Sequence, residues 1–147
     1  MTTIITSVVV SLVVSLITLY VFQPIQGQRA LREEIASANR LYRTATSKVR
    51  ADWKNQGERE AAKAEAEEAT QALRVLSAQL RASLVTFPAG GKFYRLLEFS
   101  GLVESRENVS KASSELTAWA YSIRMGDSQA AQRHRLEVIK ALGLPRD

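Results

Sequence analysis

The sequence predicts an all-α protein with one N-terminal transmembrane helix followed by a cytoplasmic helical bundle. Residues 4–22 carry no charge, no glycine and no proline, and the first charged side chain of the 147-residue chain is Arg29. After residue 23, apolar residues recur at spacings of three and four and never alternate with period two, which indicates helices and no sheet. We therefore divide the chain into a transmembrane helix, 1–23, and a cytoplasmic domain, 24–147.

The apolar run Ile4–Phe22 has the length of a membrane span. Thirteen of its 19 residues are Val, Ile, Leu or Phe, and a span needs about 20 mainly apolar residues. A strand of this length would be too long for a globular sheet. The alternative is a cleaved secretory signal, which needs a basic N-terminal region and a small-residue cleavage site. Residues 1–3 are Met-Thr-Thr and residues 23–28 contain no such site, so we favour the span.

The charge asymmetry predicts the orientation of the span. Four arginines follow it within about 20 residues, and no basic residue precedes it: Arg29, Arg32, Arg40 and Arg43. The positive-inside rule then places the N-terminus outside and the C-terminal domain in the cytoplasm. We expect a single-pass protein of a cell inner membrane or plasma membrane, of bacterial type. The same arginines are candidate ligands for anionic lipid headgroups, at about 1 kcal/mol each.

Small polar residues form one face of the predicted span. They follow spacings of four, four and three: Ser7, Ser11, Ser15 and Thr18. Small residues at such spacings let two spans approach closely and hydrogen-bond. The alternative is that each hydroxyl bonds to the carbonyl four residues earlier in its own helix. The sequence leaves both interpretations open.

Residues 28–87 predict a long antiparallel helical hairpin, after Pro24 ends or kinks the span. The first helix has apolar residues at heptad spacing, as in coiled coils: Leu31, Ile35, Ala38, Tyr42, Ala45 and Val49. The second, over 58–86, continues that spacing with Ala62, Ala66, Ala69, Leu73, Leu76, Leu80 and Phe87. The link Asn55-Gln56-Gly57 is short enough for an antiparallel turn. At that turn, five glutamates between residues 58 and 68 would lie near Lys48, Arg50 and Lys54.

Residues 92–142 predict two or three shorter helices. Pro88-Ala89-Gly90-Gly91 separates them from the hairpin, and Gly101 closes a short helix over 92–99. We expect the segment 90–102 to fold over the end of the bundle. A long helix then runs from Ser105 to Gly126, and a last one, capped by Asp127 or Ser128, ends at Leu142. Their core residues are predicted to be Val109, Ala112, Leu116, Trp119, Ala120 and Ile123, followed by Val138, Ile139 and Leu142.

Candidates for chemistry are few. The chain has no cysteine and one histidine, which excludes thiolate metal sites, a cysteine nucleophile and a histidine pair. Gly90-Gly91-Lys92 lacks the spacing and the Ser or Thr of a phosphate loop. Arg133-His134-Arg135 is expected to be solvated surface, with Glu137 as the surface partner of His134. We therefore assign no catalytic, cofactor-binding or metal-binding residue and expect no enzyme.

These observations favour a membrane-anchored scaffold, adaptor or regulatory protein without catalytic activity. The expected partners are the lipid bilayer and either another protein or a second copy of the chain. Nucleic acid is not expected, because the basic excess lies in the helix that leaves the membrane. The alternative is a membrane-active effector of holin or toxin type, whose span oligomerises and permeabilises the bilayer.

Overall fold

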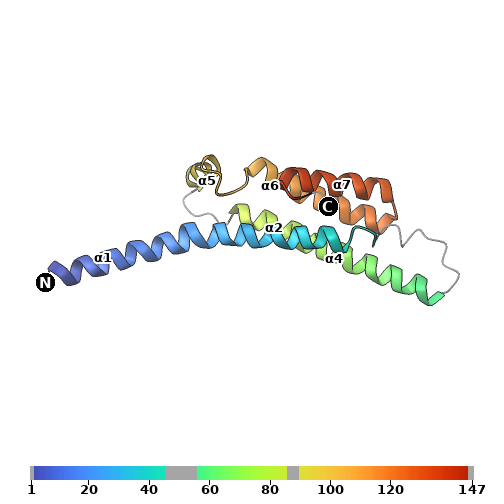
Figure 1. The fold of residues 1–147 in the computed structure, drawn as a ribbon, viewed down its shortest axis with the longest axis horizontal. Coiled ribbons are helices and arrows are strands. Elements are labelled where there is room, and N and C mark those ends of the chain that lie inside the picture. Colours follow the sequence, from blue (N-terminus) through green and yellow to red (C-terminus); the bar gives the residue numbers. More distant parts are fainter. Residues whose placement is uncertain (1, 46–55, 86–89, 146–147) are drawn as a thin grey trace.

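The protein is mainly helical over residues 2–45, 56–85 and 90–145, the parts of the chain that this computed structural model describes. The element order is α1 (Thr2–Ile17), the π-helical turn η1 (Thr18–Phe22), α2 (Gln23–Leu41), α4 (Gln56–Val85), α5 (Gly90–Phe99), α6 (Arg106–Met125) and α7 (Ser128–Leu142). These ranges contain no strand, as the sequence predicts. In Figure 1, α1 projects away from the other helices, of which α2, α4, α6 and α7 lie side by side.

The first three elements form one uninterrupted helix from Thr2 to Leu41, in which Pro24 does not end the helix. Of the two predicted effects of Pro24, an end of the helix is therefore wrong, and a kink stays a prediction. A proline inside an α-helix removes one backbone donor and its ring crowds the carbonyl four residues earlier. Here the turn before Pro24 is π-helical, and the Gln23 N–H donates to the Thr18 carbonyl, five residues back. A π-turn redirects the local hydrogen bonds, which lets the helix continue.

Helices α2 and α4 run antiparallel and in contact, as expected of a hairpin (Figure 1). Their ends differ from the prediction. Helix α2 ends at Leu41, earlier than the expected Val49, and Gln56 and Gly57 open α4 instead of forming the link. Val49, Phe87, Pro88 and Asn55, with the basic residues of the tip (Lys48, Arg50 and Lys54), lie outside the described residues, so the charge pairing at the tip stays a prediction.

One hydrophobic cluster joins α2, α4, α6 and α7. All the predicted apolar positions of α4 from Ala62 to Leu80 are buried, as are all those predicted for α6 and α7. Trp119 is 2% exposed, and Leu73 and Leu116 are completely buried. The residues that face this cluster are spaced by three and four along each helix, so packing follows the pattern that the sequence shows.

A network of hydroxyl groups crosses the contact between α4 and α6. Ser77 Oγ donates to the Ser113 carbonyl at 2.8 Å and lies 2.9 Å from Thr117 Oγ1. Ser113 Oγ donates to the Ser77 carbonyl at 3.1 Å and accepts from Arg81 Nε at 2.9 Å. Buried hydroxyls are stable only when they are hydrogen-bonded. These reciprocal bonds therefore select the observed register of the two helices.

The predicted boundaries of α6 and α7 are confirmed by their caps, whereas α5 starts at Gly90, two residues before the predicted start, so Gly90 and Gly91 belong to the helix and not to the link. The Ser105 hydroxyl accepts from the Asn108 N–H, and the Asp127 carboxylate accepts from the Ala130 N–H. Gly126 ends α6 at φ 70°, a left-handed conformation that suits glycine. Local sequence signals are sufficient here because a cap involves residues only two or three positions apart.

Candidate membrane-anchoring site

Helix α1 exposes apolar side chains on every side except the face formed by Ser7, Ser11 and Ser15. Val9, Val10, Leu12, Val13 and Val14 are each about half exposed, and every α1 side chain that the structure describes is exposed. Within the described residues, one helix, Val9–Leu41, is long and apolar enough to cross a membrane. A helix with a broad apolar surface is typical of a buried or a membrane-spanning position, and α1 is not buried.

Three of the four small polar residues of the span lie on α1, and Thr18 opens the π-helical turn η1 directly after it. Ser7, Ser11 and Ser15 are exposed, so a second helix could approach them. Thr18 Oγ1 donates to the Val14 carbonyl at 2.9 Å. Thr18 thus satisfies its hydroxyl within its own helix, as the second interpretation requires, and the three serines remain candidates for a packing face.

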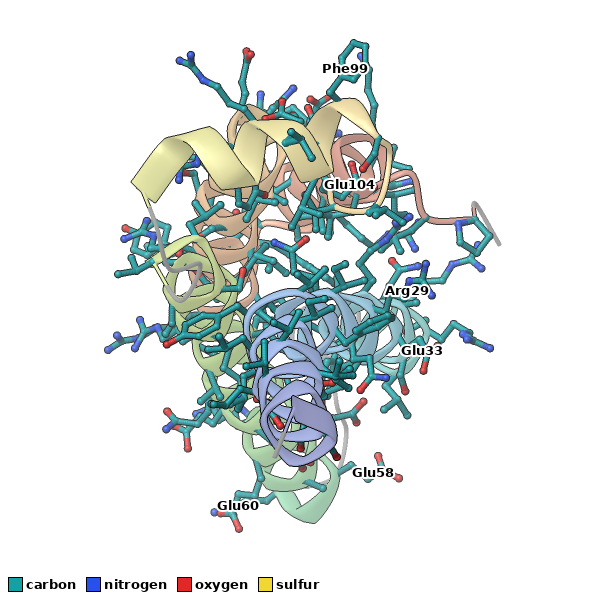
Figure 2. All side chains as sticks on the ribbon, turned by 90° about the vertical axis from the view of Figure 1, so that its left-hand side faces the viewer. Arg29, Glu33, Glu58, Glu60, Phe99 and Glu104 are labelled. Carbon is teal, nitrogen blue, oxygen red and sulfur yellow. The ribbon has the colours of Figure 1, made fainter. Side chains whose placement is uncertain are left out.

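The four arginines of the predicted headgroup site have different surroundings. Arg29 is exposed and lies one turn from Glu33 on the outer side of α2 (Figure 2). Arg40 and Arg43 are exposed as well. Arg32 is engaged within the protein: its Nη1 lies 2.9 Å from Glu104 Oε1, and its Nη2 donates to the Leu142 carbonyl at 2.7 Å. It joins α2 to the end of α7 and to the loop before α6.

Helix α5 packs against the junction, which we define as the residues around Val21 and Ile25, where the N-terminal helix meets the other helices. A second hydrophobic cluster consists of Ile25, Tyr94, Leu97 and Val103, with Val21 and Leu84 at its edge. The segment 90–102 therefore covers the end of the helix assembly that is closer to α1, in agreement with its predicted place. The sequence did not indicate that Ile25, directly after Pro24, would be its partner.

Tyr94 is the polar centre of this junction. Its hydroxyl donates to the Glu104 carbonyl at 2.5 Å and accepts from Gln28 Nε2 at 3.4 Å. The Arg106 guanidinium lies 4.8 Å from the centre of its ring, within cation–π range. Burial raises the pKa of the Tyr94 hydroxyl above its usual value, and the Gln28 hydrogen bond partly offsets this. Tyr94 is thus a neutral hydrogen-bonding contact between α5, α2 and the loop before α6.

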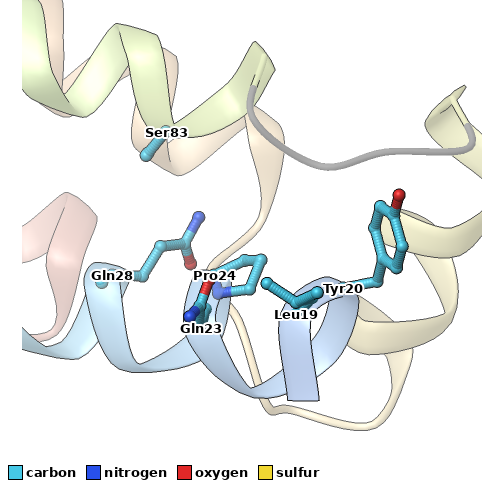
Figure 3. A pocket seen from close by; sticks show the side chains of 7 residues that line it. Leu19, Tyr20, Gln23, Pro24, Gln28 and Ser83 are labelled. Carbon is cyan, nitrogen blue, oxygen red and sulfur yellow. The ribbon is translucent and has the colours of Figure 1, made fainter. Parts of the chain in front are cut away.

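A pocket of about 410 Å³ opens beside the junction (Figure 3). Gln28 is its most buried wall residue, and Gln28 Oε1 is buried without a hydrogen-bond partner among the described residues. The lining contains no carboxylate, cation or thiol: Leu19, Tyr20, Gln23, Pro24, Gly27, Gln28 and Ser83. The pocket therefore offers apolar contacts and amide hydrogen bonds, and lacks a group suited to general acid–base catalysis near neutral pH.

The basic triplet differs from its prediction in two ways. Arg135 is 8% exposed and donates from Nη1 to Asn39 Oδ1 at 3.0 Å, so it is not solvated surface. His134 Nδ1 lies 2.6 Å from Glu115 Oε2 on α6, and the expected partner Glu137 instead pairs with Lys111 at 2.6 Å. The hydrogen bond to Lys111 lowers the pKa of Glu137 and raises that of Lys111. Both pairs join α6 to α7. Spacings of three or four residues along one helix do not predict such pairs, because the two partners lie on different helices.

No cluster typical of a metal site or a phosphate loop is present among the described residues. No group of three or more His, Cys, Asp or Glu side chains lies close enough to hold a metal ion in that part of the chain. Gly90-Gly91-Lys92 forms the start of α5, and the last described residues before it belong to helix α4. Glu104, a carboxylate in the loop before α6, is paired with Arg32.

Comparison of the chain with protein-family models, with curated proteins and with solved structures found no match.

Proposed function

We propose that the chain is a single-span, membrane-anchored scaffold or adaptor that holds a cytoplasmic helical bundle at the inner face of a cell inner membrane or plasma membrane. The observation that carries this proposal is the continuous helix from Thr2 to Leu41. Its first half exposes apolar side chains outside the serine face, and its second half contributes Ile35 and Ala38 to the main hydrophobic cluster.

This continuity supports an anchoring role, because the helical body has a fixed position relative to the span. A flexible linker would let a tethered domain turn freely, whereas an uninterrupted helix transmits depth and rotation. Such a connection suits a protein that presents a surface to a partner at a set distance from the bilayer. We propose a protein partner or a second copy of the chain for that surface.

The length of the helix also limits which arginines could reach the lipid headgroups. With a rise of about 1.5 Å per residue, Arg29 lies about 10 Å beyond Phe22, and Arg40 about 27 Å beyond it. The headgroup layer is only about 5–7 Å thick on each side. A long arginine side chain can reach back over a few ångströms, so Arg29 is the arginine best placed for a headgroup. Arg40 and Arg43 act in this scheme as orientation signals during insertion.

The test measures topology first. We expect a single cysteine at Thr2 to react with an impermeant thiol reagent in intact cells, and one at Ser128 to react only after lysis. The chain has no native cysteine, so each signal has one source. Labelling of Ser128 in intact cells would contradict the cytoplasmic assignment.

Membrane potential then separates the scaffold from the membrane-active effector. We expect no loss of potential when the full chain, or residues 1–28 fused to an inert domain, is overexpressed. A rapid collapse with the 1–28 fusion would overturn the scaffold and support the holin- or toxin-type alternative.

A further inference from the structure

Large apolar side chains are concentrated on the outer surface of α5 and the residues around it. Val85 is 84% exposed, Leu96 65%, Phe99 95% and Leu102 43%. Val85 and Phe99 are the two most exposed large apolar side chains among the described residues after Phe22. Patches of this kind on a folded protein mark a contact surface for another protein or for a membrane.

Helix α5 has two apolar faces, each formed by residues three apart. Tyr94 and Leu97 face inward and pack with Ile25. Leu96 and Phe99 face outward, and Figure 2 shows Phe99 extending away from the other helices. The inward face explains how α5 is held in place, so the outward face needs a separate explanation.

The depth of α5 along the N-terminal helix identifies the occupant of this outward face. The 19-residue apolar run 4–22 spans about 28 Å, close to the roughly 30 Å of a hydrocarbon core. The core therefore ends near Phe22, and the headgroup layer of about 5–7 Å extends over the next four or five residues. Helix α5 packs on Val21 and Ile25, at the level of that layer.

The orientation of α5, like its depth, is the one expected of a helix at the membrane surface. Viewed along α1 from the N-terminal end, α5 crosses the direction of the span (Figure 2), and Figure 1 shows it nearly end-on at the side of the body where α1 leaves. A helix perpendicular to a span lies parallel to the membrane surface. The exposed Arg95 is adjacent in sequence to Leu96 and suits anionic headgroups. Tyr20, 46% exposed, lies at the depth where aromatic side chains are enriched.

We propose that α5 is an interfacial helix that inserts Leu96 and Phe99 into the headgroup and upper acyl region of the bilayer that α1 crosses. This inference rests on the proposed membrane anchor. Interfacial helices bury an apolar face about 5–10 Å into this boundary. With α5 inserted, the protein contacts the membrane at two places, and these fix the tilt and the rotation of the helical body.

The experiment uses the full chain, reconstituted in vesicles whose lipids carry bromine on the acyl chains. A fluorophore is attached to one introduced cysteine, in Leu96→Cys, Met125→Cys or Val14→Cys. Leu96 and Met125 are matched at 65% and 64% exposure, but Met125 is at the far end of α6, about 30 Å from its start. Val14 reports the span itself. We expect strong quenching by the lipid bromine at Val14 and Leu96, and none at Met125.

Each other outcome identifies a different failure. Quenching at Val14 but not at Leu96 overturns the interfacial helix and leaves the anchor intact. If Leu96 is then also shielded from aqueous iodide, a protein covers α5. Quenching at Met125 equal to that at Leu96 means that the whole body lies on the bilayer, which removes the special role of α5. No quenching at Val14 overturns the anchor, and the interfacial helix with it.

Discussion

The two halves of the N-terminal helix share one backbone but differ in what surrounds their side chains. Every α1 side chain that the structure describes is exposed, whereas α2 buries Ile25, Gln28, Ile35, Ala38 and Asn39. In α1 the apolar residues cover every side except the serine face, and in α2 they follow one stripe. The comparison teaches that hydrophobicity alone does not predict burial within a protein. A broad apolar surface is typical of a buried helix or a membrane span, and a periodic stripe is typical of packing against other helices on one side.

Polar side chains mark the same division. In α2, Gln28 contacts α5, Arg32 contacts the end of α7, and Asn39 accepts from Arg135. Directional bonds of this kind fix which helix lies where, since an unpaired buried polar group costs about 1–3 kcal/mol. The first half of the helix exposes an apolar surface. The polar contacts of the second half determine how α2, α5 and α7 are arranged relative to one another.

The largest expected effect comes from placing a charge in the buried core of the helical body. Leu73→Asp should unfold the helical body, because losing a buried leucine costs about 2–5 kcal/mol and an unpaired buried carboxylate costs more. Leu73 is completely buried, whereas Val75 on the same helix is 47% exposed. Thermal unfolding of the detergent-solubilised chain, followed by circular dichroism, should show Val75→Asp melting like the parent. Equal melting of both variants would contradict the packing of α4.

A carboxylate placed in α1 should weaken the proposed membrane anchoring and leave the stability of the helical body unchanged. Val13→Asp places a carboxylate at the middle of the apolar run and should weaken insertion by about 2.5–3.5 kcal/mol. We expect more protein in the soluble fraction after alkaline extraction of membranes, with the melting of the body unchanged. Val13→Leu is the control and should stay in the membrane. A lowered melting temperature in Val13→Asp would show that α1 is part of the packed body.

A smaller effect tests the directional contacts of α2. Arg32→Ala removes the bonds to Glu104 and to the Leu142 carbonyl, which should cost about 1–3 kcal/mol and lower the melting temperature by several degrees. Arg29→Ala is the matched control, because Arg29 is exposed on the same helix, and we expect almost no change. If both variants melt alike, the Arg32 contacts contribute nothing to stability.

The smallest effect concerns the serine face of the span. Ser11→Leu should weaken self-association or partner association in a membrane two-hybrid assay, since such contacts are worth about 0.6–2 kcal/mol. The added side chain would hold the two backbones apart. Val13→Leu, on another face, should leave the signal unchanged. Equal signals from both variants would reduce the span to an anchor and assign partner choice to the helical body.

The parts of the fold that the sequence could predict depend on local chemistry. The helices, the burial of α4 and α6 and the caps at Ser105 and Asp127 follow from spacings of two to four residues. Pro24 was misjudged because the general rule assumes an α-helix, and a π-turn removes the conflict.

The candidate site was less predictable because its contacts join distant residues. Arg32 bonds to a carbonyl 110 positions away, and Arg135 to an amide 96 positions away. Nothing in the local charge pattern separates Arg32 from Arg29, or Arg135 from Arg133. The outward apolar face of α5 was visible in the sequence as Leu96 and Phe99. Its exposure became evident only when Tyr94 and Leu97 were found to supply the inward contacts.

The bond between Arg32 and the Leu142 carbonyl has a consequence for synthesis. At about 5–20 residues per second, a ribosome needs roughly 5–20 s to add the 110 residues between these partners. During that interval Arg32 cannot form this bond, because Leu142 has not yet been added. The contact between α2 and the end of α7 therefore forms only at the end of synthesis, and until then the incomplete chain is a substrate for chaperones and proteases.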